Sequence, residues 1–227
     1  MRIAVLGTGI VGQALAGKLD ALGHAVAIGT RDPAATLARQ IAGPMGNPPM
    51  ATWLEDHPAV KVQTFAEAAA GSEWILLAAS GQNARAVLEA AGAEHLAGKV
   101  LIDITNPLDF SAGFPPQLSV HNDDSLGEQL QRAFPGAKVV KALNTVNANL
   151  MVDPARLANG AHTMLIAGDD ADAKAQVTGL LTDGFGWTDV LDLGGIDNAR
   201  GLEMYLPLWT RLYRALDTPD FSIRVVR

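Results

Sequence analysis

Gly7-Thr8-Gly9-Ile10-Val11-Gly12 follows the apolar run of residues 2–6 and precedes residues 13–19, where Leu and Ala recur at helical spacing. An apolar strand, a G-x-G-x-x-G turn and a helix in this order are typical of a Rossmann dinucleotide-binding unit. The first glycine permits a tight turn, the second leaves room for a pyrophosphate, and the third lets the helix approach the strand. The free N–H groups at the start of the helix then attract the phosphates. A purely structural glycine turn is the alternative, but this context favours a bound dinucleotide.

The residues that follow predict an α/β fold, a Rossmann doubly wound and mostly parallel sheet with a small C-terminal α/β extension. Residues 74–79 are continuously apolar, as is usual for a central parallel strand buried on both faces. Proline and glycine are dense in residues 43–49, which predicts a loop, and residues 52–58 are expected to form a helical turn inside a longer insertion.

Strands are expected over residues 2–6, 24–29, 61–65, 74–79, 99–103, 138–143, 162–167, 187–192 and 221–225. Helices are expected over residues 34–42, 66–70, 84–96, 125–134, 171–181 and 198–216. We expect residues 1–147 to form a nucleotide-binding domain. Residues 148–227 are expected to form a small region that packs on this domain and either extends its sheet or covers its site.

The composition excludes several classes of function. The chain has 227 residues, 48% of them apolar, and its net charge of -7 argues against a nucleic-acid partner. It has no cysteine, which excludes disulfides and thiolate metal sites and is compatible with a cytoplasmic location. The apolar N-terminal run is too short to span a membrane. No histidine pair has metal-site spacing, and no G-x-S-x-G sequence indicates a hydrolase.

The residues after the second expected strand indicate which dinucleotide is bound. An NAD-binding unit usually has Asp or Glu there, which binds the ribose 2′-hydroxyl. This chain has Thr30 and Arg31 instead. A hydroxyl and a guanidinium suit a 2′-phosphate, and Asp32, directly before Pro33, is expected to cap the next helix. NADP(H) is therefore predicted in preference to NAD(H), the alternative being that Arg31 is an ordinary surface arginine.

Loops after three later strands are expected on the ligand side of the sheet. Open α/β sheets bind ligands at the carboxyl ends of their strands. These loops should therefore face the nicotinamide half of the cofactor. The residues concerned are Ala79 and Ser80, Asn106 and Pro107, and Asn144 and Thr145.

The ordered set of motifs resembles the F420-dependent NADP oxidoreductases, which share their domain with bacterial dinucleotide-binding oxidoreductases and the cytoplasmic domains of STEAP metalloreductases. The matching segments run the full length of the chain: residues 2–12, 23–31, 141–145, 167–170, 198–200, 203 and 206–208. The resemblance implies that NADP(H) is held by Thr8, Gly9, Thr30 and Arg31. It also implies that a deazaflavin or flavin lies near the nicotinamide, against Asn106, Pro107, Asn144 and Thr145.

Two departures from this family concern the second substrate. The family's F420 enzymes typically have an isoleucine-proline-tryptophan stretch after the fourth strand, where this chain has Ala78-Ala79-Ser80-Gly81. They also commonly have a histidine where this chain has Asn144. The resemblance therefore supports NADP(H) more firmly than it supports F420.

The sequence thus predicts an NADP(H)-dependent oxidoreductase that passes hydride between NADPH and coenzyme F420 or a flavin. Such a transfer needs stacked rings and exclusion of water but no protein nucleophile, so no catalytic residue is predicted. Two other functions stay open: an NADPH-binding sensor without turnover, and a reductase of a small carbonyl or imine. A carbonyl reductase would need an acid or base. Lys141 is the best candidate, although an ion-paired or surface lysine is more common.

The remaining polar candidates also have structural interpretations. His24 is expected to be structural, and His121 to be an ordinary loop residue. Asn198, Arg200 and Glu203 share one helical turn. They either line a pocket or form a polar network that fixes the C-terminal region on the sheet.

The expected helix over residues 198–216 carries more large apolar side chains than one face against its own sheet should need. Trp209 and Tyr213 are four residues apart on it, which is more typical of a core or a dimer interface than of a cofactor site. We therefore expect a homodimer that uses this region.

Overall fold

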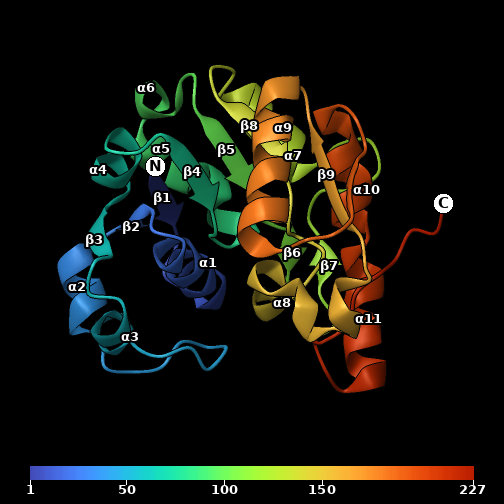
Figure 1. Ribbon diagram of the computed structural model, residues 1–227, viewed down its shortest axis with the longest axis horizontal. Helices are drawn as coiled ribbons and strands as arrows, with labels where there is room; N and C mark the ends of the chain where they lie inside the picture. Colours follow the sequence, from blue (N-terminus) through green and yellow to red (C-terminus); the bar gives the residue numbers. More distant parts are fainter.

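An eight-stranded sheet forms the centre of the protein (Figure 1). The computed structural model describes residues 1–227. The strands lie in the order β10-β9-β8-β5-β4-β1-β2-β3. Their bounds are β1 (Arg2–Leu6), β2 (Ala25–Thr30), β3 (Lys61–Thr64), β4 (Trp74–Leu77), β5 (Val100–Asp103), β8 (Lys138–Lys141), β9 (Met164–Gly168) and β10 (Val190–Asp192). From β3 to β8 all neighbours are parallel, in the strand order of a Rossmann fold, which confirms the predicted fold class.

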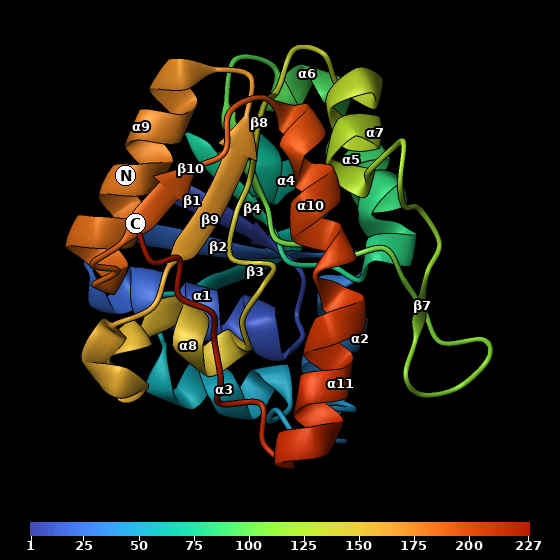
Figure 2. The same ribbon diagram turned by 90° about the vertical axis from the view of Figure 1, so that its right-hand side faces the viewer.

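Helices cover both faces of the sheet because successive strand residues point to opposite sides. Ile3 and Val5 of β1 belong to one hydrophobic core, and Ala4 and Leu6 to the other. The first core lies under α1 (Ile10–Ala21), α8 (Ala148–Val152) and α9 (Ala171–Gly179), and the second under α4 (Phe65–Ala70), α5 (Ala84–Ala91), α6 (Ala93–Leu96), α7 (Leu126–Ala133) and α10 (Ala199–Met204). Figure 2 shows α9 on one side of the sheet and α7 and α10 on the other. Among the helices, none has both the length and the apolar character needed to cross a bilayer.

The C-terminal region extends the sheet, as expected. β9 pairs antiparallel with β8, and β10 pairs parallel with β9. The strand predicted over residues 221–225 is wrong, because only one backbone–backbone hydrogen bond joins it to the sheet, from the N–H of Thr163 to the carbonyl of Ile223 (2.9 Å), and the N–H of Val225 donates to the side chain of Thr163 (3.0 Å). Phe221 is buried with its ring 5.2 Å from that of Trp209. Phe221 therefore packs on the helix that carries Trp209, while Ile223 and Val225 bond Thr163 without forming a strand ladder.

Two predicted helices are each broken at one residue. The helix predicted over residues 198–216 is α10 followed by α11 (Leu206–Leu216), because Pro207 has no N–H with which to continue the first helix. The helix predicted over residues 84–96 is α5 followed by α6, because Gly92 between them has a φ of 89°. The helix predicted over residues 34–42 ends earlier, as α2 (Pro33–Ala38).

Several short elements carried no signal in the sequence, because one or two turns or pairs are too short to show a period. They are the hairpin of β6 (Leu108–Asp109) and β7 (Gln117–Leu118), α8, the 3-10 turns η1 (Gly81–Asn83), η2 (Pro154–Arg156), η3 (Ala158–Gly160) and η5 (Ile196–Asn198), and the π-helical turn η4 (Leu180–Phe185) that continues α9. The helical turn expected over residues 52–58 is α3 (Met50–Asp56).

Candidate functional site

The glycine loop between β1 and α1 has two glycines that the fold requires and one that it does not. Gly7 has a φ of 141°, and a Cβ there would collide with the carbonyl of Ala78. A Cβ at Gly12 would collide with the carbonyl of Gly7. At Gly9 a Cβ would meet no atom within 4 Å. Gly7 and Gly12 thus allow the tight packing of strand and helix, whereas Gly9 leaves open space in front of the helix.

The N-terminus of α1 has the properties of an anion site. Gly9 is its N-cap residue and has no side chain to bond the first N–H groups. Ile10 and Val11 form the first turn, and Thr8 is half-buried beside it. Uncapped N–H groups and the positive end of the helix dipole both attract a phosphate.

The three polar residues at the end of β2 differ in whether they already have a partner in the protein. Thr30 is 8% exposed, and its Oγ1 lies 2.8 Å from Oγ1 of Thr36. The carboxylate of Asp32 accepts a hydrogen bond from the N–H of Ala35 (2.9 Å) and caps α2, as predicted. Arg31 is exposed and makes no hydrogen bond or ion pair. The guanidinium of Arg31 is therefore free to meet an anion, while the hydroxyl of Thr30 already has a partner.

The loops after β4, β5 and β8 come together at the carboxyl edge of the sheet. A Cβ at Gly81 would collide with the carbonyl of Asn106, so the loop that carries Ala79 and Ser80 touches the loop that carries Asn106 and Pro107. Nδ2 of Asn106 donates to the carbonyl of Asn144 (3.0 Å). The structure thus brings the predicted loops together.

Asn144 is held more tightly than the sequence suggested. It is 3% exposed, and its Nδ2 donates to Oδ1 of Asn106 (2.9 Å) and to the carbonyl of Leu202 (3.1 Å). The neighbouring Thr145 is also buried, and Leu143 before it has a φ of 66°. Oδ1 of Asn144 is buried without a partner. A buried acceptor without a donor is uncommon, and it is the one such side-chain atom in the predicted loops.

Lys141 is buried in an ionic cluster. Its Nζ lies 2.9 Å from Oδ2 of Asp103 and 2.7 Å from Oε1 of Glu203, and it also donates to the carbonyl of Thr105. All three residues of the ion cluster are at most 1% exposed. Burial by itself lowers the pKa of Lys141, but the carboxylates of Asp103 and Glu203 outweigh it, so the pKa is raised. With all three N–H groups engaged and its charge retained, Lys141 has no free proton or lone pair for catalysis.

The C-terminal region is fixed on the sheet by the same polar network. Glu203 accepts hydrogen bonds from the N–H groups of Leu126 (2.8 Å) and Gly127 (3.0 Å) at the start of α7. Arg200 forms a bidentate pair with Glu128 (2.6 and 2.9 Å), and this pair lowers the pKa of Glu128. Of the two interpretations of Arg200 and Glu203, the structure shows the network. Asn198 bonds only locally, to Gly195 and Asp197.

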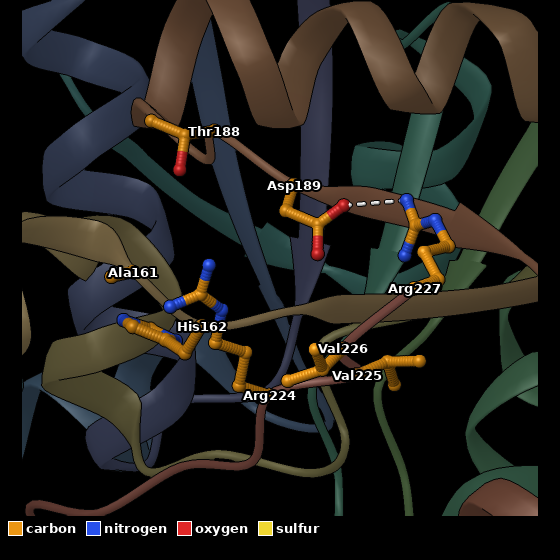
Figure 3. Close-up of a pocket in the computed structure, with 8 residues that line it drawn as sticks. All are labelled: Ala161, His162, Thr188, Asp189, Arg224, Val225, Val226 and Arg227. Carbon is orange, nitrogen blue, oxygen red and sulfur yellow. Dashed lines mark hydrogen bonds and ion pairs between the residues drawn. The ribbon is translucent and has the colours of Figure 1, made fainter.

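The side chains of the other candidates make no hydrogen bond to the loops of the site. His121 is exposed, whereas Trp209 is half-buried and stacks on Tyr213 (5.7 Å between ring centroids). No group of His, Asp and Glu residues is arranged to hold a metal ion. A cavity of about 410 Å³ lies beside β10 and contains no predicted site residue. Figure 3 shows its lining, in which Arg227 is paired with Asp189 (2.7 Å).

The sequence did not indicate that residues 36–50 form the second side of a cavity at the glycine loop. A cavity of about 180 Å³ lies between Thr8, Gly9 and Gln13 on one side and residues 36–50 on the other. Arg39 at the end of α2 lines it. The only signal for this wall was the density of Gly and Pro in residues 43–49, which identifies a loop but not its position.

Known proteins resemble this chain over all or part of its length. Residues 2–107 match the family described as NADP oxidoreductase coenzyme F420-dependent. The chain is 33% identical to the F420-dependent NADP reductase of Methanothermobacter marburgensis over 93% of its own length and 92% of that protein. It is 29% identical to metalloreductase STEAP3 of Rattus norvegicus over 92% of its own length, but spans only 38% of that protein. A crystal structure of a proposed F420-dependent NADP reductase from Arthrobacter sp. FB24 is 56% identical, covers 100% of both chains and has a TM-score of 0.95.

Proposed function

The chain belongs to the family of F420-dependent NADP oxidoreductases, and from this premise we propose that it transfers hydride between NADPH and coenzyme F420 or a flavin-type acceptor. As a member of this family it is an NADP-dependent oxidoreductase. The observation that carries the proposal is the uncapped start of α1, which has open space in front of it at Gly9. The unpaired guanidinium of Arg31, directly after β2, adds a group for a second phosphate.

The residues of the site fit NADP(H). The N–H groups at the start of α1, with Thr8, would hold the pyrophosphate, and Arg31 would hold the 2′-phosphate. The loops with Ala79, Ser80, Asn106, Pro107, Asn144 and Thr145 would flank the nicotinamide. Oδ1 of Asn144, which has no partner in the protein, supplies an acceptor for a carboxamide or ring N–H. NADPH supplies the hydride when bound, and the protein contributes orientation and exclusion of water.

A panel of acceptors tests this function directly. Protein and NADPH are mixed with F420, FMN, FAD, quinones, ferric chelates, small ketones and imines, and the nicotinamide absorbance is followed. We expect oxidation of NADPH with F420 or a flavin. Tight NADPH binding without oxidation by any acceptor would indicate a sensor. Turnover with ketones or imines alone would indicate a carbonyl or imine reductase, for which the buried Lys141 offers no free proton.

Asn144→Leu is expected to slow reduction of the acceptor about tenfold and to leave the Kd of NADPH within about twofold. The substitution removes the unpartnered Oδ1 and leaves the carbonyl of Leu202 and Oδ1 of Asn106 without their donor. Steady-state kinetics and NADPH titration measure the two effects. Asn149→Leu, at an exposed position of α8, is the control. If both parameters of Asn144→Leu stay at wild-type values, the acceptor binds elsewhere.

A homodimer through α11 is proposed from its exposed apolar side chains. Leu208 and Leu216 are each 53% exposed, and Phe110 and Phe114 of the adjoining loop are 55% and 51% exposed. Phe114 contacts Tyr213 edge-to-face (6.1 Å), so helix and loop form one surface. Exposed apolar surface of this kind is typical of an interface. We expect a dimeric mass in light scattering at micromolar concentration and a monomeric mass for Leu208→Glu. A monomeric wild-type protein would contradict the proposal.

A further inference from the structure

The segment between α2 and α3 is anchored to the start of α1. Nε2 of Gln13 donates to the carbonyl of Pro48 (2.9 Å). Within the segment, the N–H of Gly43 donates to the carbonyl of Asn47 (2.8 Å) and the N–H of Gly46 to the carbonyl of Gly43 (2.9 Å). In Figure 1 this segment, drawn in light blue, passes below α1. Residues 39–49 therefore form a closed loop beside the glycine loop.

The cavity between the two loops carries a single charge. Its lining includes Thr8 and Gly9 of the glycine loop, Thr36 and Arg39, and no acidic residue. Arg39 is exposed, and its guanidinium makes no hydrogen bond or ion pair. The cavity is therefore positive and has no carboxylate to compete with an anion for that charge.

Ile41 and Asn47 also offer side-chain atoms to this cavity. Ile41 lines the cavity and is 77% exposed. Asn47 also lines it, is 8% exposed, and has no hydrogen bond from its side-chain amide. A free guanidinium and an open apolar side chain are together complementary to the phosphate and the base of a purine nucleotide.

We propose that residues 39–49 are a clasp for the adenosine half of NADP(H), in which Arg39 is a second guanidinium for the 2′-phosphate and Ile41 is an apolar surface for the adenine. Thr36 lies three residues before Arg39 and is bonded to Thr30 at the end of β2, where this fold places the adenosine ribose. Thr36 and Arg39 line the same cavity, so Arg39 lies on the side of the segment that faces the glycine loop. The proposal rests on the binding of NADP(H), but not on the identity of the acceptor.

Calorimetric titration with 2′,5′-ADP and 5′-ADP tests the role of Arg39 without any turnover. Arg39→Ala is expected to bind 2′,5′-ADP about tenfold more weakly and 5′-ADP within about twofold of wild type, because only the first ligand has a 2′-phosphate. Arg156→Ala removes another exposed, unpaired arginine and should change neither affinity. Unchanged affinity for 2′,5′-ADP, or equal losses for the two ligands, would overturn this role of Arg39.

Ile41→Ser is expected to weaken both nucleotides about threefold or more, since the adenine loses apolar contact in either case. Met45→Ser is the matched control, because Met45 is 72% exposed in the same loop but does not line the cavity.

Trypsin cleavage after Arg39 should be slowed by 2′,5′-ADP and not by nicotinamide mononucleotide. Equal protection by both, or by neither, would contradict the clasp. Since no acceptor is present, a failure of F420 or flavin turnover leaves these results unaffected.

Discussion

Lys141→Met is expected to lower the free energy of unfolding by about 3–5 kcal/mol, because it leaves two buried carboxylates without their cation. Asp103 and Glu203 both bond Nζ of Lys141, and neither is exposed by more than 1%. The N–H groups of Leu126 and Gly127 bond Glu203, and the N–H and hydroxyl of Thr105 bond Asp103 (2.9 and 2.7 Å), but none of these donors carries a positive charge. Methionine fills the volume of the lysine side chain, so the expected loss is electrostatic and not a packing defect.

Urea denaturation of Lys141→Met and Lys138→Met measures this effect against a matched control. Lys138 lies on the same strand and pairs with Asp170 (3.0 Å), but its side chain is 36% exposed. Exposed pairs contribute about 0–1 kcal/mol, so Lys138→Met should be nearly neutral. The double variant Lys141→Met/Glu203→Gln should recover part of the loss, since it removes one of the two unpaired charges. If Lys141→Met and Lys138→Met lower the free energy of unfolding by equally small amounts, the buried ion cluster does not stabilise the fold.

The stability from this cluster is expected to be constant across neutral pH. The pKa of Lys141 is raised in the folded protein. A raised lysine pKa gives stability that is fully present below the unfolded pKa and is lost as the pH rises through the folded one. The ionisation of Lys141 should therefore add no pH dependence to the free energy of unfolding of the wild type between about pH 6 and pH 9. Loss of the charge of the Lys141 ammonium within this range, followed by NMR, would mean that Lys141 is neutral when folded.

Arg31→Ala is expected to weaken NADPH binding by about 2–3 kcal/mol, which is about 30- to 150-fold. Arg31 is exposed and has no partner in the protein, so two charge-assisted bonds to the 2′-phosphate are open to it. Its exposure also means that salt screens the interaction, so the loss should shrink at high ionic strength. NADH affinity should change much less, because NADH has no 2′-phosphate.

Titration of NADPH and NADH into wild type, Arg31→Ala and Arg156→Ala measures this preference. Equal losses for both cofactors would mean that Arg31 supports the adenine or the fold in general. A wild-type protein that prefers NADH would overturn the assignment of the 2′-phosphate to Arg31. The effect of Arg39→Ala should be smaller than that of Arg31→Ala, since the latter lies directly at the end of β2.

The parallel half of the sheet was predictable because its signals are local. The apolar run of β4, the capping aspartate before Pro33 and the glycines around α1 each act within a few residues, and each is where the sequence placed it. Elements whose limits depend on distant contacts were predicted less well. The segment around Phe221 alternates like a strand, but its aromatic ring packs on Trp209 and no strand pairs with it.

The sequence by itself determined the Rossmann fold, the glycine loop and the loops that meet at the carboxyl edge of the sheet, because periodicity and turn chemistry are properties of neighbouring residues. Only the tertiary structure decided what the polar side chains do. It buried Lys141 between carboxylates from β5 and α10, paired Asn144 with Asn106, and brought Arg39 beside Gly9. These partners are tens of residues apart in the chain, and which charges meet in a buried site depends on how the helices pack across the sheet.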